Sequence, residues 1–233
     1  MKELMNNNHI KCSHDIGCSC YPKYYKEEGY SLSQNSYKDV PGWVNDAEYI
    51  YKEMVDEAQD GDHFVEIGTF LGQSATRMGE LIKSSGKKIT FDSIDLFWLI
   101  PHTIKRYDEA GHPYQFCQYL NEFEKIGCSI VDIIRHPFKQ IGIDDYINLI
   151  TCDEKYSHRL YDDNSLKFVW IDGDHGPNII YKHLVNYWPK LKKGGVIGGD
   201  DIEFSGVLDD VKKFTKEKNI QVEYSYNGFK LIK

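Results

Sequence analysis

The sequence predicts an α/β protein with a doubly wound, mostly parallel, seven-stranded sheet and an antiparallel C-terminal edge. Short β-rich segments alternate with segments of helical periodicity, and this alternation predicts βαβ units. The last two β-rich segments, 220–224 and 229–232, are joined by a tight turn at 226–228, so they must be antiparallel. With 233 residues, 41% of them hydrophobic, the chain can bury one sizeable core.

The expected elements follow one another from residue 45. Apolar residues at helical spacing predict a first helix over 45–59. Strands are expected at 63–67, 89–96, 146–151, 168–171 and 196–197, with further helices at 74–83, 178–191 and 207–218. Pro189 disfavours a regular last turn in the 178–191 helix, and the Lys-Lys-Gly-Gly run at 192–195 is expected to end it.

Two stretches depart from this alternation. Residues 1–40 are rich in Asn, Ser, Lys and Tyr without periodicity, so an arm or lid is expected before a domain at 41–233. Residues 99–145 form a long insertion between strands, which predicts a substrate lid. The arm carries His9, Cys12, His14, Cys18 and Cys20. These are zinc-ligand types, but structural zinc sites favour two pairs separated by a longer loop, which favours a metal-free tail.

Composition excludes several classes of partner. Lys and Arg total 28 against 36 Asp and Glu, and the positive charges are not clustered, so nucleic acid is not an expected partner. No run of eighteen apolar residues occurs, and the N-terminus has no apolar segment after its first lysine, so neither a membrane span nor secretion is expected. Six cysteines are too few for a disulfide scaffold. The expectation is a cytoplasmic protein with reduced thiols.

A glycine-containing loop follows the first expected strand. Residues 65–75 read VEIGTFLGQSA, where Gly68 permits a tight turn and the helix start at Gln73 and Ser74 offers free N–H groups to a polar ligand. The loop has neither the G-x-G-x-x-G pattern nor the Gly-Lys-Ser/Thr of a phosphate loop, which argues against NAD and ATP. Asp95 ends the second expected strand, where a carboxylate can bind both hydroxyls of a ribose.

Acidic residues follow two further strands. Asp172, Asp174 and His175 come after one strand, and Asp200 and Asp201 come after the next. Consecutive parallel strands bring their carboxyl ends to one edge of a sheet, where open α/β sheets bind ligands. Crowded carboxylates repel one another unless a cation neutralises them, and hard oxygen ligands suit Mg²⁺, Mn²⁺ or Ca²⁺. The sequence therefore predicts a divalent-cation site.

These motifs resemble those of a known enzyme family. E-x-G-x-x-x-G-x-S, Ile-Asp95, D-G-D-H and G-G-x-x-G-D-D together resemble class I S-adenosylmethionine-dependent methyltransferases, which have a Rossmann-like fold. The nearest group is the metal-dependent sugar O-methyltransferases of the macrolide-sugar type, with catechol and caffeoyl-CoA O-methyltransferases more distant. The resemblance covers residues 41–233 and is specific for fold and cofactor, but weak for the substrate.

The resemblance implies a role for each matching residue. Asp95 would bind the ribose, and Asp153 would lie near the adenine amino group, although this chain has Asp-Glu where relatives often have Asp-Ser. His175 matches a catalytic Lys or His of relatives, and Asp174 matches a base proposed for some sugar methyltransferases, so the choice of base stays open. The residues expected around the methionine moiety are Glu66, Gly68, Thr69, Phe70, Gly72 and Ser74, and those expected to bind Mg²⁺ or Mn²⁺ are Asp172, Asp200 and Asp201.

The predicted activity is transfer of a methyl group from S-adenosylmethionine to a hydroxyl of a vicinal diol on a sugar or glycan. The cation would lower the pKa of that hydroxyl. Two alternatives stay open: methylation of a catechol-type aromatic diol, and a non-catalytic adenosyl-binding protein, against which the complete acidic set argues. The expected partner is a small-molecule or glycan substrate, and homo-oligomers are possible. His183 is expected on the partly exposed face of its helix.

Overall fold

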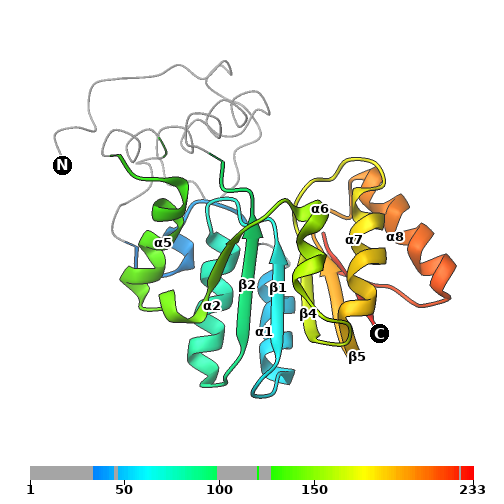
Figure 1. Ribbon diagram of the computed structural model, residues 1–233, viewed down its shortest axis with the longest axis horizontal. Coiled ribbons are helices and arrows are strands. Elements are labelled where there is room, and N and C mark those ends of the chain that lie inside the picture. Colours follow the sequence, from blue (N-terminus) through cyan, green and yellow to red (C-terminus); the bar gives the residue numbers. More distant parts are fainter. Residues whose placement is uncertain (1–33, 45–46, 99–119, 121–126, 226) are drawn as a thin grey trace, which may run out of the picture.

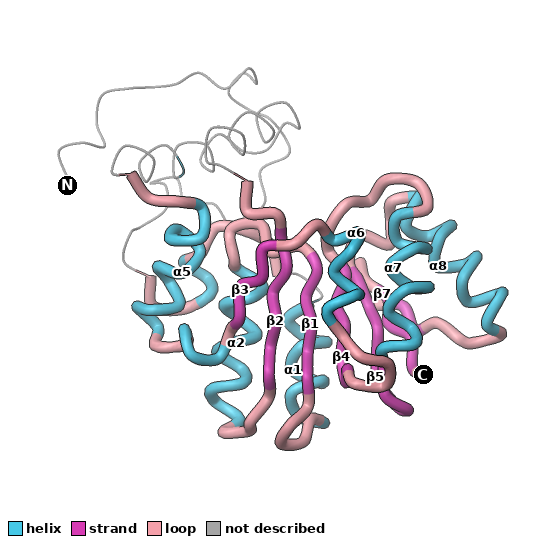
Figure 2. The backbone as a smooth tube through the Cα atoms, viewed as in Figure 1, coloured by secondary structure: helices cyan, strands magenta, loops and turns pink. Residues whose placement is uncertain are grey.

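In a computed structural model of the protein, residues 34–44, 47–98, 120, 127–225 and 227–233 are described. They form a seven-stranded sheet with the order β3-β2-β1-β4-β5-β7-β6 (Figures 1 and 2). The strands are β1 (His63–Ile67), β2 (Thr90–Asp95), β3 (Asn148–Thr151), β4 (Leu166–Ile171), β5 (Leu191–Gly199), β6 (Glu223–Tyr224) and β7 (Phe229–Ile232). The first five are parallel, and β7 is antiparallel to β5 and β6. The predicted fold class is confirmed.

Helices cover both faces of the sheet, and two apolar clusters fill the layers between them. Alternation along the strands separates these clusters: Phe64 and Phe168 pack toward the first group of helices, and Val65 and Val169 toward the second. The first group is α1 (Ala47–Glu57), α2 (Gln73–Ser85) and α5 (Ile130–Ile141), and the second is α7 (Ile179–Tyr187) and α8 (Ser205–Lys218) (Figure 1). A one-turn helix, α6 (Glu154–Ser157), follows β3.

Part of the expected insertion at 99–145 belongs to the core. Helix α5 begins with a capping box formed by Ser129 and Asp132, and its Ile134 and Phe138 are fully buried against the α2 side of the sheet. It is followed by the 3₁₀ turn η3 (Asp144–Tyr146). Residues 99–119 and 121–126 lie outside the described residues, so the substrate lid predicted over 99–145 stays a prediction.

The helix expected at 178–191 is shorter in the structure. Helix α7 ends at Tyr187, and Pro189 lies in the 3₁₀ turn η5 (Trp188–Lys190), because proline cannot donate the N–H that a continuing α-helix needs. Residues 192–195 were expected to end this helix, but they belong to β5. There the N–H of Gly194, at φ +72°, bonds to the carbonyl of Lys233.

The end of the expected N-terminal arm packs on α2. The backbone N–H of Tyr37, in the 3₁₀ turn η2 (Tyr37–Asp39), donates to Glu80 Oε1 at 3.0 Å. The side-chain amide of Gln73 donates to the carbonyl of Val40 at 2.7 Å.

A further 3₁₀ turn, η4 (His158–Leu160), follows α6. The cysteines and histidines at 9–20 lie outside the described residues.

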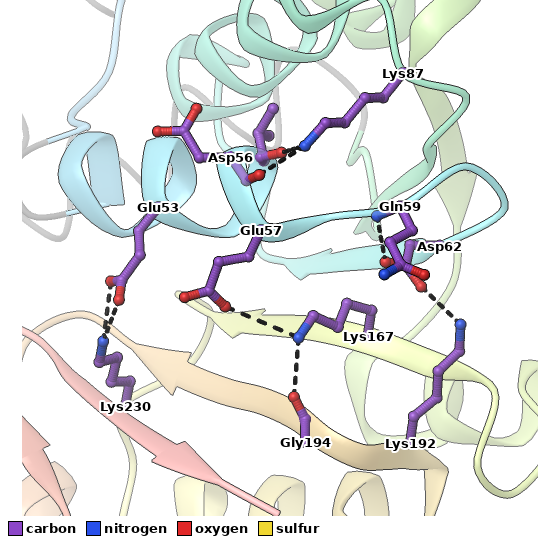
Figure 3. A network of polar contacts seen from close by, with 11 residues as sticks. Glu53, Asp56, Glu57, Gln59, Asp62, Lys87, Lys167, Lys192, Gly194 and Lys230 are labelled. Atoms are coloured by element: carbon purple, nitrogen blue, oxygen red, sulfur yellow. Dashed lines mark hydrogen bonds and ion pairs between the residues drawn. The ribbon is translucent and has the colours of Figure 1, made fainter.

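Ion pairs join α1 and the following turn to the sheet (Figure 3). Glu53 pairs with Lys230 of β7 at 2.7 Å, Glu57 with Lys167 of β4 at 4.0 Å, and Asp62 with Lys192 of β5 at 2.7 Å. We call these three pairs the lysine clasp. They connect the layer that carries α1 to three different strands.

The parallel strands end together at one edge, which we call the carboxyl edge. The pairing register places Ile67 of β1 beside Ile94 of β2 and Ile171 of β4, and it places Ile171 beside Gly199 of β5. The arrowheads of β1 and β2 in Figure 1 point to this edge. The glycine loop and both acidic motifs therefore leave the sheet side by side.

Candidate functional site

The glycine loop runs from Gly68 to Gly72, between β1 and α2. Gly68 has φ +93°, and a β-carbon there would clash with the carbonyl oxygen of Asp172. Only glycine therefore allows the loop to approach the end of β4 this closely. The loop also contains Phe70 at φ +51°, a conformation that L side chains rarely adopt. The glycine loop and the acidic segment after β4 thus form one continuous wall.

Asp95 holds this loop in place. Its Oδ2 accepts hydrogen bonds from the N–H groups of Thr69, at 3.0 Å, and Phe70, at 3.2 Å. Its Oδ1 accepts from the N–H of Phe97 at 3.2 Å. The carboxylate expected to bind ribose is therefore positioned by the loop that would surround the cofactor, and its Oδ1, which accepts one hydrogen bond, keeps acceptor capacity for a hydroxyl.

Glu66 lies beneath the loop and is fully buried. Its carboxylate accepts hydrogen bonds from Tyr51 Oη at 2.7 Å and from Ser93 Oγ at 2.6 Å, and Ser93 in turn contacts Thr69 Oγ1 at 2.7 Å. Burial raises the pKa of Glu66. Tyr51 and Ser93 were not predicted from the sequence, where they appear only as an apolar helix position and a strand residue.

A cavity of about 930 Å³ opens at the carboxyl edge. Glu66 and Gly72 are not among the described residues that line it. Asp153 lines it while its Oδ1 caps α6 by accepting from the N–H of Lys155. The other predicted residues on its wall are Gly68, Thr69, Phe70, Ser74, Asp95, Asp172, Asp174, His175, Asp200 and Asp201.

The acidic residues converge in this cavity. Asp172, His175 and Asp201 each present a ligand atom within 4.8 Å of the other two. His175 Nε2 lies 3.1 Å from Asp201 Oδ2. Asp200 is buried beside them, and its Oδ1 accepts from the N–H of Asp201, whose φ is +62°. The structure therefore groups His175 with two of the three predicted metal ligands.

The electrostatics of the cluster fit a divalent cation. Burial, followed by the charges of Asp200, Asp201 and Glu66, raises the pKa of Asp172 well above its ordinary value. An ion held by Asp172 and Asp201 would remove this penalty, and carboxylate oxygens suit Mg²⁺ or Mn²⁺. The donor set thus fits the predicted metal.

The two candidate bases differ in their surroundings. The ring of His175 stacks on the half-exposed Phe204, with centroids 5.6 Å apart and an interplanar angle of 22°. Asp174 is exposed, and its Oδ1 accepts from the N–H of Gly176, within the same turn. His175 is therefore held with its ring over the acidic cluster, whereas the carboxylate of Asp174 shapes its own loop.

His183 was expected on the partly exposed face of its helix. In the structure it is buried, with 4% of its surface exposed. Its Nε2 lies 3.8 Å from Oε1 of Glu154, which lines the cavity. The helix period places His183 beside the apolar Leu184 and one turn before Tyr187, both fully buried, so its burial follows from packing against the sheet.

Aromatic side chains form much of the remaining wall. Trp43, from the segment before α1, contacts Phe70 with ring centroids 5.1 Å apart. Phe97 and Trp98 follow β2, and Phe204 precedes α8. Sequence reasoning predicted Phe70 but missed Trp43, Phe97, Trp98 and Phe204, because an isolated aromatic residue in a loop carries no periodicity or spacing signal.

Comparison with known proteins identifies the family. A profile described as a methyltransferase domain matches residues 65–202, which include the glycine loop and both acidic motifs. This chain belongs to the methyltransferase domain family. The predicted class of enzyme is therefore confirmed. No curated protein matches the chain.

Solved structures share the fold of this methyltransferase at low sequence identity. A putative caffeoyl-CoA O-methyltransferase from Staphylococcus aureus is 13% identical, with a TM-score of 0.55 over 84% of this chain and 86% of that chain. An O-methyltransferase from Bacillus cereus in complex with SAH is 13% identical, with a TM-score of 0.51 over 83% of each. A SAM-dependent O-methyltransferase from Thermotoga maritima is 12% identical, with a TM-score of 0.50, and the match spans 82% of this chain but 65% of that protein.

Two further features concern the predictions about cysteines and about membrane-spanning segments. Cys128 and Cys152 are free thiols. Among the described residues, none of the helices has the length and apolar character that crossing a bilayer requires.

Proposed function

We propose that this methyltransferase transfers the methyl group of S-adenosylmethionine to a hydroxyl of a vicinal diol, with a divalent cation at the acidic cluster. The observation that carries the proposal is the convergence of Asp172, His175 and Asp201 in the same cavity as the glycine loop. Solved structures of the same fold include O-methyltransferases, one of them in complex with SAH. A methyltransferase with these two features in one cavity has the parts that O-methylation needs.

Residues of the glycine loop and of β2 would hold the cofactor. The backbone of Gly68 to Phe70 and the hydroxyl of Ser74 would surround the methionine moiety, and Asp95 would accept hydrogen bonds from the ribose. Asp153 would face the adenine amino group. Glu66 acts on this site through Ser93 and Thr69, since it does not itself line the cavity.

Asp172, Asp200 and Asp201 would hold Mg²⁺ or Mn²⁺, which leaves the imidazole of His175 available as a base. The ion when bound lowers the pKa of a coordinating hydroxyl and orients its neighbour. His175 then accepts the hydroxyl proton at Nε2, while Phe204 stacks on the ring and keeps its orientation. In the alternative, the exposed carboxylate of Asp174 takes this proton.

The proposed acceptor is a sugar or glycan hydroxyl. A second candidate is an aromatic diol, because Trp98 and Phe204, 37% and 51% exposed, offer flat apolar surfaces in the same cavity as the acidic cluster. Aromatic faces bind the planar ring of a catechol by stacking. The proposed localisation is cytoplasmic.

Methyl transfer from labelled S-adenosylmethionine to a panel of sugars, glycosides and catechols tests the proposal. The panel is run with Mg²⁺ and again after verified metal removal. Transfer to a diol that stops with chelator and returns with Mg²⁺ or Mn²⁺ supports it. Undiminished transfer in chelator contradicts the metal-assisted mechanism, and cofactor binding without transfer to any acceptor favours the adenosyl-binding alternative.

A further inference from the structure

The segment after β4, residues 172–175, carries the metal-binding and base candidates. Among the described residues, two hydrogen bonds tie its backbone to other parts of the chain. The N–H of Asp172 donates to the carbonyl of Ile67 at 2.8 Å, and the N–H of Asp174 donates to Glu154 Oε2 at 3.3 Å. The first bond continues the sheet. The second depends on one side chain.

The carboxylate of Glu154 has two contacts, one with the 172–175 segment and one with α7. Its Oε2 receives the N–H of Asp174, and its Oε1 lies 3.8 Å from Nε2 of the buried His183. The carboxylate also occupies space that a side chain at position 173 would fill, because a β-carbon on Gly173 would overlap Glu154 Oε2. The missing side chain at position 173 thus makes room for this carboxylate.

Glu154 also connects two halves of the cavity. It is the first residue of α6, directly after Asp153, which is the expected adenine contact, and both residues line the cavity. Its carboxylate reaches across to the segment that carries Asp172 and His175. A change in its position would therefore move the acidic segment without removing any group that touches the reacting atoms.

We propose that Glu154 is a positioning residue that holds the 172–175 segment in its productive geometry through the Asp174 N–H, with His183 and the space at Gly173 fixing its carboxylate. The inference rests on the proposed function for its effect on turnover. The requirement is for an acceptor oxygen rather than a negative charge, so glutamine at this position should serve.

The test compares Glu154→Ala, Glu154→Gln and Gly173→Ala in the full chain. The Gly173→Ala variant leaves Glu154 in the sequence but displaces its carboxylate, which is the flexible end of a side chain and can move. Hydrogen exchange at the Asp174 amide is the first readout. We expect faster exchange in Glu154→Ala and Gly173→Ala, and unchanged exchange in Glu154→Gln. Glu57→Ala, which removes an exposed carboxylate from α1, is the matched control and should leave this amide unchanged.

Turnover is the second readout. Because a misplacement of about 1 Å costs up to about 10²-fold, kcat should fall by about ten- to a hundredfold in Glu154→Ala and Gly173→Ala, with KM for S-adenosylmethionine nearly unchanged. The double variant should be no slower than Glu154→Ala alone, and Glu154→Gln should keep most of the activity.

Three results would overturn the proposal: normal Asp174 exchange in Glu154→Ala, losses in the two single variants that multiply in the double variant, or a Glu154→Gln enzyme as slow as Glu154→Ala. The exchange measurement needs no substrate. If the wild type transfers no methyl group while the exchange pattern is as expected, the proposed function fails and the positioning role stands.

Discussion

The lysine clasp and the acidic cluster at the carboxyl edge are both built on carboxylates, but they differ in what lies opposite. In the clasp, Glu53, Glu57 and Asp62 each face a lysine (Figure 3). In the cluster, Asp172 and Asp201 have no lysine or arginine partner among the described residues, and Asp172 faces other carboxylates. Paired carboxylates stabilise the fold, whereas the cluster costs stability unless a cation binds. That difference is physical evidence for function at the carboxyl edge.

The largest expected effect concerns His175. Loss of a general base typically costs about 10²–10⁴-fold in rate, so His175→Ala should lower kcat by that factor while S-adenosylmethionine affinity stays nearly constant. Steady-state kinetics across pH provide the measurement. Near-normal kcat in His175→Ala, together with a large loss in Asp174→Asn, would assign the proton transfer to Asp174 instead.

Asp95 is intermediate between the lysine clasp and the acidic cluster, because its partners are N–H groups rather than lysines. Asp95→Ala should remove the hydrogen bonding of the carboxylate to the ribose, worth about 0.5–1.5 kcal/mol a bond, and free the loop at Thr69 and Phe70. The resulting loss of affinity for S-adenosylmethionine is about tenfold to a hundredfold. Calorimetric titration measures it. If Asp95→Ala binds the cofactor as tightly as wild type, the ribose lies elsewhere.

A third prediction tests most directly whether the acidic cluster and the lysine clasp have opposite effects on stability. Asp172→Asn removes a charge that burial and neighbouring carboxylates penalise, so the metal-free protein should become more stable while losing turnover. A gain of about 1 kcal/mol raises Tm by about 2–4 °C in a chain of this size. Thermal unfolding in chelator is the measurement. A lower Tm would show that Asp172 is a stabilising group, like the clasp carboxylates.

The matched change in the clasp should have the opposite sign and a smaller size. Glu53→Gln weakens the pair with Lys230, which is partly exposed, so it should cost about 0.2–1 kcal/mol of unfolding free energy and leave kcat unchanged. The same unfolding experiment measures it. A large loss of turnover with intact folding would mean that α1 communicates with the site.

The smallest expected effect is on the pH dependence of stability. Burial acts to raise the pKa of Asp62, but hydrogen bonds from the Gln59 N–H and Lys192 outweigh it and lower the pKa. This contribution is present above the ordinary Asp pKa and is lost as pH falls through the lowered value, so Asp62→Asn should flatten the acid limb. The raised pKa of Asp172 acts with the opposite sign, because the metal-free fold gains stability as pH falls through it. Equal slopes in the wild type and Asp62→Asn below pH 4 would contradict the first assignment.

The contrast between the two regions also explains what the sequence predicted. Residues at the ends of strands, such as Gly68, Asp95 and Asp172, lie at the expected edge of the sheet because parallel strands end at a common edge. Helix α5 was missed although Ile130, Ile133, Ile134 and Phe138 have helical spacing, because Pro137 interrupts it and no clear strand precedes it. Such local patterns carry information only about local structure.

Contacts between segments that are distant along the chain could not be predicted from the sequence. Glu66 is separated from Ser93 by 27 residues, and Asp174 from Glu154 by 20, so no spacing rule links them. The lysine clasp joins Glu53 to Lys230 across 177 residues. The burial of His183 likewise depends on how closely α7 packs on the sheet. Tertiary packing decides each of these contacts.

The central claim is that the acidic cluster at the carboxyl edge holds a divalent cation. Titration of metal-free protein with Mn²⁺, followed by electron paramagnetic resonance, measures this directly. We predict one bound ion in the wild type and in the clasp variant Glu53→Gln, and loss of that ion in Asp172→Asn. No bound ion in the wild type, or the same bound ion in Asp172→Asn, would contradict the account.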